Sequence, residues 1–100
     1  ELLDSCDKKR LMNRTHIYTQ IDKERDYQDS RWNANTTTSE GKHEVAAWLL
    51  FIRSYLNEAD EFVSRKPDPQ GSHLALHNLR KIAAMAVACM EQHHCPSRNI

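Results

Sequence analysis

Residues 43–65 read HEVAAWLLFIRSYLNEADEFVSR, and this stretch decides the fold of the 100-residue chain. Its apolar side chains recur every three or four residues, which is the spacing that places them on one face of an α-helix. The repeating positions are Val45, Trp48, Leu49, Ile52, Leu56, Ala59 and Val63. The stretch therefore predicts a long amphipathic helix whose apolar face has to be covered. We expect Trp48 to lie in the core.

A second strong helical signal lies near the end of the chain. Residues 82–90, IAAMAVACM, are apolar on nearly every side, which is typical of a helix packed by several neighbours. We expect this segment to form the centre of a helix over about residues 73–93. Pro67 and Pro69 must lie in the turn that precedes it, and Ser72 is a credible N-cap.

The remaining helix is predicted over about residues 15–31, with a less regular helical lead-in within residues 1–14. Residues 33–42 read NANTTTSEGK and have the Asn, Thr, Ser and Gly content of a flexible loop. No segment shows the alternation of a β-strand. The sequence therefore predicts an all-α chain of three main helices, and residues 1–100 form one domain.

Length and composition limit the size of the core. A chain of 100 residues with 39% hydrophobic residues supports a small core only. Chains of this kind are often completed by a second copy of themselves. We expect a helical bundle that is completed by oligomerisation, as a homodimer or a higher homo-oligomer, through the apolar faces of the helices at 43–65 and 73–93.

Charge and cysteine content restrict the partners and the compartment. The chain has 14 Lys plus Arg and 14 Asp plus Glu, which gives no electrostatic reason to expect nucleic acid or an anionic membrane as a partner. The longest apolar run, residues 82–90, is too short to cross a bilayer. The cysteines Cys6, Cys89 and Cys95 are odd in number, and Cys89 is expected to be a buried thiol. With no signal peptide in view at residues 1–14, we expect a cytoplasmic protein.

Polar residues interrupt the apolar face of the first helix. Ile17 and Ile21 begin a stripe with four-residue spacing, and Glu24 and Gln28 continue the same stripe. Polar groups in such a position have to be paired. One interpretation is that the helix provides Glu24 and Gln28 to a ligand, a metal or a partner chain. The alternative is that the helix leaves the core after Ile21.

Two acidic residues on the helix at 43–65 are candidate metal ligands. Glu58 and Glu61 are one helical turn apart, and carboxylates with this spacing can share one magnesium ion. The alternative is a solvated acidic edge, which is common on helices. His73 and His77 also have a spacing that suits joint metal binding, but without the paired spacing of a structural zinc site their pattern favours surface roles.

Two further residues are candidate contacts for a nucleotide. Trp32 lies beside the expected loop and is free to stack on a base, whereas Trp48 belongs to the apolar face. Arg80 and Lys81, at the start of the apolar segment, are placed to contact phosphate. The alternative for both cations is a solvated helix flank.

The chain resembles the all-α, MazG-like nucleoside triphosphate pyrophosphohydrolases, especially the short type of phages and mobile elements. The resemblance covers about residues 17–96. It rests on KERDYQDSRW at 23–32, EVAAWLLFIRSYLNEADEF at 44–62 and LRKIAAMAVACMEQH at 79–93. It implies a bundle built by helices of two subunits, in which acidic side chains bind magnesium. The implied reaction cleaves a nucleoside triphosphate to a monophosphate and pyrophosphate.

The metal motifs of this family match the chain only in part. The resemblance implies that the first motif, Glu-x-x-Glu, falls on Tyr55 and Glu58, and that the second, Glu-x-x-Asp, falls on Asn78 and Lys81. One acid remains, and a lysine stands where a metal ligand is expected. A register shifted by one helical turn makes Glu58 and Glu61 the first acidic pair instead.

Three expectations for function follow. The first is a pyrophosphohydrolase-like enzyme in which Glu58 and Glu61 are catalytic and hold Mg²⁺. The second is a non-catalytic descendant that binds a nucleotide or a protein partner, with Lys81 neutralising phosphate directly. The third is a purely structural helical oligomer. The residues expected to bind a nucleoside triphosphate substrate are Glu24, Gln28, Trp32 and Lys81.

Overall fold

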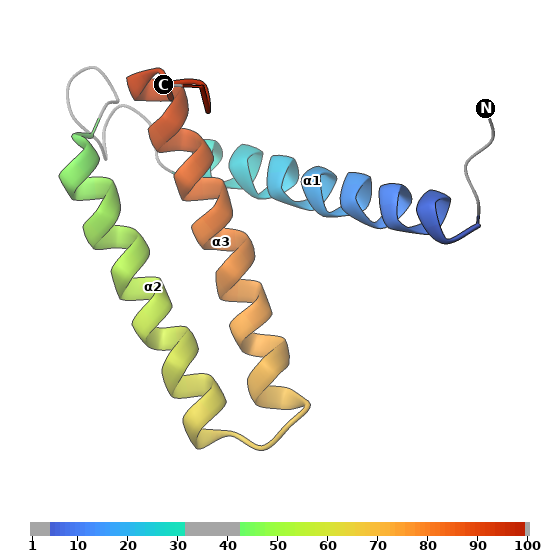
Figure 1. The fold of residues 1–100 in the computed structure, drawn as a ribbon. Coiled ribbons are helices and arrows are strands. Elements are labelled where there is room, and N and C mark those ends of the chain that lie inside the picture. Colours follow the sequence, from blue (N-terminus) through green and yellow to red (C-terminus); the bar gives the residue numbers. More distant parts are fainter. Residues whose placement is uncertain (1–4, 32–42, 100) are drawn as a thin grey trace.

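The computed structural model describes residues 5–31 and 43–99, and the side chains from residue 13 onward within them. The chain forms three helices, which are α1 (Ser5–Arg31), α2 (Val45–Arg65) and α3 (Gln70–His93). Helices α2 and α3 form an antiparallel hairpin. Helix α1 crosses α3 with its C-terminal part, and its N-terminal part extends away from the hairpin (Figure 1). Within the described residues α3 packs on both other helices, whereas α1 and α2 do not pack on each other. The predicted all-α bundle is confirmed.

The helix boundaries differ from the predicted ones mainly at their N-terminal ends. Helix α1 begins at Ser5, so the expected lead-in belongs to one continuous helix with residues 15–31. Helix α2 begins at Val45, two residues later than predicted. The predicted loop at 33–42 lies outside the described residues. None of the helices in the described part of the chain has the length and apolarity of a membrane span.

The prediction that Ser72 is the N-cap of α3 is wrong. The helix begins at Gln70, directly after Pro69, so Ser72 lies inside the first turn. The carboxylate of Asp68 accepts hydrogen bonds from the backbone N–H of Ser72 at 3.3 Å and from its hydroxyl at 2.5 Å. The helix starts earlier because Asp68 satisfies a free N–H of the first turn, and because Pro69 has no N–H that needs a partner there.

The connection between α2 and α3 is tight at Gly71. A Cβ atom on Gly71 would lie 2.6 Å from the carbonyl oxygen of Phe62 and 2.7 Å from that of Lys66. Both are backbone atoms, which cannot move aside as a side chain can. The close approach of α3 to the end of α2 therefore depends on a residue without a side chain at this position.

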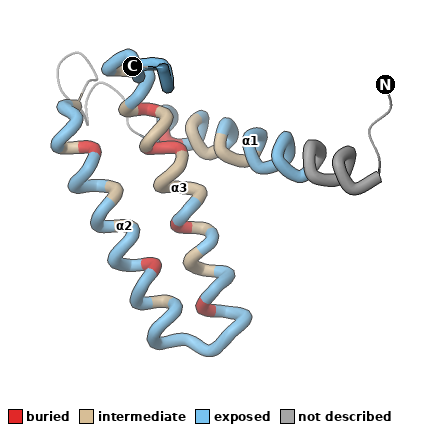
Figure 2. The backbone as a smooth tube through the Cα atoms, viewed as in Figure 1, coloured by how far each residue is buried: buried red, intermediate tan, exposed pale blue. Residues whose placement is uncertain are grey.

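The core is small and lies between α2 and α3. Trp48 of α2 is buried against Met85 and Ala88 of α3, which confirms the prediction for Trp48. The indole N–H of Trp48 donates a hydrogen bond of 2.9 Å to the side chain of Gln92. Figure 2 shows that α2 is mostly exposed, whereas α3 is largely buried or intermediate. Cys89 is half-buried, so its thiol is less enclosed than expected.

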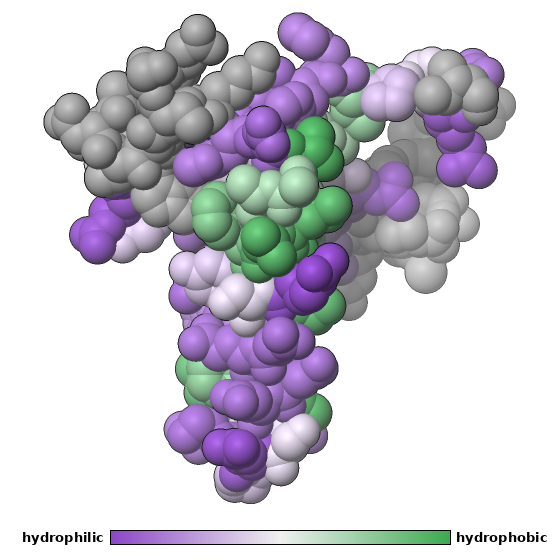
Figure 3. Space-filling model, turned by 90° about the vertical axis from the view of Figure 1, so that its left-hand side faces the viewer, coloured by the Kyte–Doolittle hydropathy of each residue, from purple (hydrophilic) through white to green (hydrophobic). Residues whose placement is uncertain are grey.

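A large part of the apolar surface is not covered in the single chain. On α2 the exposed fractions are 49% for Leu49, 46% for Leu56 and 57% for Val63, although all three belong to the predicted apolar face. Apolar side chains gather on the side of the molecule where α2 lies, in the upper half of the hairpin (Figure 3). Oligomerisation through these faces stays a prediction.

Candidate functional site

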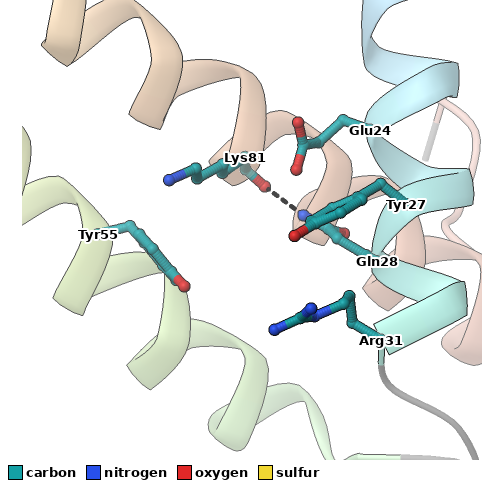
Figure 4. Close-up of a pocket in the computed structure, with 6 residues that line it drawn as sticks. All are labelled: Glu24, Tyr27, Gln28, Arg31, Tyr55 and Lys81. Atoms are coloured by element: carbon teal, nitrogen blue, oxygen red, sulfur yellow. Dashed lines mark hydrogen bonds between the residues drawn. The ribbon is translucent and has the colours of Figure 1, made fainter.

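A cleft of about 270 Å³ lies where α1 crosses the hairpin. This volume is just below the range for small-molecule sites, about 300–1,000 Å³. All three helices contribute side chains that face one another across it (Figure 4). The lining residues are Glu24, Tyr27, Gln28 and Arg31 of α1, Tyr55 of α2 and Lys81 of α3.

Gln28 connects α1 to α3 in this cleft. Its side chain is only 4% exposed, and its Nε2 donates a hydrogen bond of 3.2 Å to the backbone carbonyl of Lys81. Its Oε1 is buried and has no hydrogen-bond partner in the structure. The polar lane that Glu24 and Gln28 form in the sequence is therefore the face of α1 that lies on α3 and lines the cleft. The buried Oε1 is an unused acceptor.

Glu24 is held by an ion pair at the same crossing. The Nε of Arg80 donates to its carboxylate at 2.8 Å, and the side chain of Glu24 is 10% exposed. This pair links α1 to α3 and neutralises the carboxylate that lines the cleft. Glu24 therefore contributes hydrogen-bond acceptors to the cleft, while its charge is balanced by Arg80.

The two cations of the cleft both lie over tyrosine rings. The ammonium of Lys81 is 5.6 Å from the ring centroid of Tyr55, and the guanidinium of Arg31 is 5.8 Å from that of Tyr27. These distances are within the range of a cation–π interaction. Within residues 13–31 and 43–99 neither cation forms an ion pair with a carboxylate. The cleft therefore carries positive charge that is not neutralised in the described structure.

Glu58 and Glu61 do not line this cleft. Both are exposed on α2. The carboxylate of Glu58 accepts a hydrogen bond of 2.9 Å from the side-chain amide of Asn78 on α3. In the part of the chain that the structure describes, no three or more His, Cys, Asp and Glu side chains are grouped to hold a metal. A magnesium ion held by Glu58 and Glu61 stays a prediction.

The four positions that the resemblance marks as metal ligands do meet. The amide of Asn78 donates to Glu58 and also, at 3.0 Å, to the backbone carbonyl of Tyr55. Lys81, one turn further along α3, lies over the ring of Tyr55. The four positions therefore lie on facing turns of α2 and α3, and their register in the metal motif stays a prediction. Where the resemblance implies carboxylates, Tyr55, Asn78 and Lys81 carry a phenol, an amide and an ammonium instead.

Sequence reasoning found some of the cleft residues and missed others. Glu24, Gln28 and Lys81 were expected to bind a substrate, and the structure brings these three together. Trp32 lies outside the described residues. Tyr27 and Arg31 are not among the residues expected to bind the substrate, although they follow Glu24 by three and seven residues and so share its helix face.

Comparisons of the chain with family models, with curated proteins and with solved structures find no match. The case for a function therefore rests on the residues of the cleft and on their geometry.

Proposed function

We propose that the chain binds a nucleoside triphosphate in the cleft between α1 and the α2–α3 hairpin. The observation that carries this proposal is the pair of cations, Lys81 and Arg31, which point into one cleft without carboxylate partners in the described structure. Lysine and arginine are the side chains that bind phosphate, the first as a point charge and the second through a fork of N–H donors. The cleft therefore suits a ligand with several anionic oxygens.

The other lining residues suit the remainder of a nucleotide. Tyr27 and Tyr55 present aromatic rings on opposite sides of the cleft, and a base stacks readily on such rings (Figure 4). Tyr27 is 57% exposed, so its ring is accessible. The Oε1 of Gln28 is an acceptor without a donor, and an amino or imino group of a base would supply one. These features favour a nucleotide over inorganic phosphate.

Binding without efficient hydrolysis is the form of the activity that we infer. Magnesium needs several oxygen ligands and usually binds through carboxylates. Here Glu58 is the one acid among the four facing positions, and it already accepts a hydrogen bond from Asn78. The ammonium of Lys81 repels a divalent cation and itself supplies positive charge to phosphate. Lys81 therefore takes over charge neutralisation that a metal would otherwise provide.

The test is a nucleotide-binding titration with matched charge variants. Each ribonucleoside and deoxynucleoside triphosphate is titrated into the full chain by calorimetry, with Mg²⁺ and with EDTA. We expect Lys81→Met and Arg31→Met each to weaken binding by about tenfold to a hundredfold, since each removes a charge-assisted hydrogen bond. Arg53→Met is the control, because Arg53 is an exposed cation of α2 that does not line the cleft. Binding should persist in EDTA.

A pyrophosphate-release assay on the same panel separates binding from hydrolysis. We expect no release above the rate of the Glu58→Gln variant. Release that needs Mg²⁺ and disappears in Glu58→Gln would favour the pyrophosphohydrolase instead, with Glu58 and Glu61 as metal ligands. Unchanged affinity in both Lys81→Met and Arg31→Met would remove the cleft as the binding site. Absence of nucleotide binding would leave a protein-binding or structural oligomer as the function.

A further inference from the structure

Two imidazoles face each other on α3, outside the nucleotide cleft. His73 and His77 are one helical turn apart, and their Nε2 atoms are 3.3 Å from each other. Their rings are perpendicular, with centroids 4.8 Å apart. Zinc binds imidazole nitrogen at about 2.0–2.1 Å with tetrahedral angles, which places two ligand nitrogens about 3.3 Å apart. The observed separation therefore equals one edge of a zinc coordination tetrahedron.

We propose that His73 and His77 form a two-histidine zinc site on α3, with its remaining positions open. Within the described residues no third His, Cys, Asp or Glu joins the pair, so water or another ligand would complete the coordination. Imidazole is a common ligand of zinc and of neighbouring transition metals, whereas magnesium prefers oxygen. The site is thus distinct in chemistry from the magnesium site that the resemblance implies.

Arg80 determines the proton positions of the empty pair. Its Nη1 lies 2.8 Å from the Nδ1 of His77, and a guanidinium only donates hydrogen bonds. Neutral His77 therefore accepts at Nδ1, carries its proton on Nε2 and donates it to the Nε2 of His73. For zinc to bind at the Nε2 of His77, that proton has to move to Nδ1. The guanidinium of Arg80, which is a rigid plane, then has to move away from the Nδ1 of His77.

Arg80 thus opposes metal binding through both its charge and its hydrogen bond. If the histidine pair is a metal site, removing Arg80 should raise its affinity for zinc. If the pair only stabilises the helix, removing Arg80 should not have this effect. Burial, followed by the charges of Arg80, His73 and Lys81, lowers the pKa of His77 below its ordinary value of 6.5, against the opposite effect of Glu24 on α1. His77 is therefore neutral at pH 7.5, and the neutral imidazole is the form that binds a metal.

The experiment is a calorimetric titration of Zn²⁺ into the full chain without an affinity tag, at pH 7.5. All proteins carry His93→Ala, His94→Ala and Cys95→Ser, which remove the other donors near the end of α3. We expect His73→Ala and His77→Ala each to weaken zinc binding by at least about tenfold, the smallest loss usual even for an outer-shell partner. His16→Ala, which removes an exposed histidine of α1, should leave the affinity unchanged.

Arg80→Met provides an independent arm of the test. We expect it to bind zinc more tightly than the parent protein, because both the repelling charge and the competing hydrogen bond are gone. Helical content by circular dichroism confirms that each variant is folded; His73 is exposed, so its substitution is not expected to unfold α3. Equal zinc affinity in the parent, His73→Ala and His77→Ala proteins would overturn the proposal, as would weaker binding by Arg80→Met.

Discussion

The side-chain amide of Gln28 donates a hydrogen bond of 3.2 Å to the backbone carbonyl of Lys81, and so joins α1 to the turn of α3 that carries a cation of the cleft. The other polar atom of the same side chain, Oε1, is buried without a partner. One side chain therefore combines a structural contact with an unsatisfied acceptor. Substitutions at Gln28 can separate these two properties.

Gln28→Met should leave stability nearly unchanged and weaken nucleotide binding. Methionine keeps the length of the side chain and removes both polar atoms, so the lost hydrogen bond is offset by the loss of an unpaired buried oxygen. We expect the free energy of unfolding in urea to change by less than about 1 kcal/mol. Gln28→Ala also leaves a cavity and should cost about 2 kcal/mol or more.

Calorimetry with the nucleotide that the wild-type chain binds best completes the test at Gln28. If Gln28→Met binds that nucleotide as tightly as the wild-type chain, the unpaired Oε1 does not contact the ligand. A large loss of stability in Gln28→Met would contradict the expected balance between the lost hydrogen bond and the removed unpaired oxygen.

Gly71→Ala should destabilise the hairpin. The added Cβ would lie 2.6 Å from the carbonyl oxygen of Phe62, and α3 would have to move away from the end of α2. We expect a loss of about 2 kcal/mol in the free energy of unfolding, which is typical of overpacking against fixed atoms. Gln70→Ala is the matched control, because Gln70 is exposed in the same turn. Equal stability of the two variants would contradict the close approach at Gly71.

The elements that could be predicted are those that depend on local periodicity. The spacing of Trp48, Ile52 and Ala59 identifies the buried face of α2 because a helix repeats regularly whatever surrounds it. The start of α3 could not be predicted in this way. Two polar residues, Asp68 and Ser72, are both able to cap a helix, and only the folded turn shows that Pro69 is the N-cap and that Asp68 accepts the N–H of Ser72.

The sequence predicts part of the cleft. Glu24 and Gln28 could be identified because they are polar residues at positions that continue the apolar stripe of Ile17 and Ile21. Tyr55 and Arg31 belong to the cleft because α1 crosses α3 at a particular angle and depth. That angle depends on long-range contacts, such as the pair of Arg25 with Glu91 at 3.0 Å. No periodicity within one helix encodes it.

Stability should depend on pH through His77. Burial and the nearby charges of Arg80, His73 and Lys81 lower the pKa of His77 in the folded chain below 6.5. Between the folded and the unfolded pKa the unfolded chain binds more protons, so the free energy of unfolding falls as the pH is lowered through 6.5. It should level off once the pH is below the folded pKa.

Urea unfolding of the wild-type chain and of His77→Gln, from pH 7.5 to pH 5 in EDTA, measures this dependence. As the pH is lowered through 6.5, the free energy of unfolding of the wild-type chain should fall relative to that of His77→Gln. The free energy of unfolding of His16→Gln, a variant at an exposed position of α1, should change with pH as that of the wild-type chain does. A constant difference between wild-type and His77→Gln would show that folding does not alter the protonation of His77.

Introducing acids at the facing positions of α2 and α3 should create a magnesium site. Asn78 and Lys81 lie one turn apart, and Asn78 already contacts Glu58. In the Asn78→Glu, Lys81→Asp double variant, carboxylates replace the amide and the ammonium, so the facing turns of α2 and α3 carry three acids together with Glu58. We expect this variant to bind Mg²⁺ at least about tenfold more tightly than the wild-type chain, since added carboxylates raise affinity for a hard cation.

The matched control carries amides, Asn78→Gln with Lys81→Asn, which keeps the side-chain sizes and omits the charges. Calorimetric titration with Mg²⁺ and thermal unfolding with and without Mg²⁺ compare the two double variants. Because three carboxylates repel one another without a cation, Mg²⁺ should raise the melting temperature of the acidic variant and not that of the amide variant.

Nucleotide binding by the acidic variant should then require Mg²⁺, whereas binding by the wild-type chain should not. If the acidic variant is folded and gains no affinity for Mg²⁺, the four facing positions do not enclose a metal site, and Lys81 does not stand in the place of a metal.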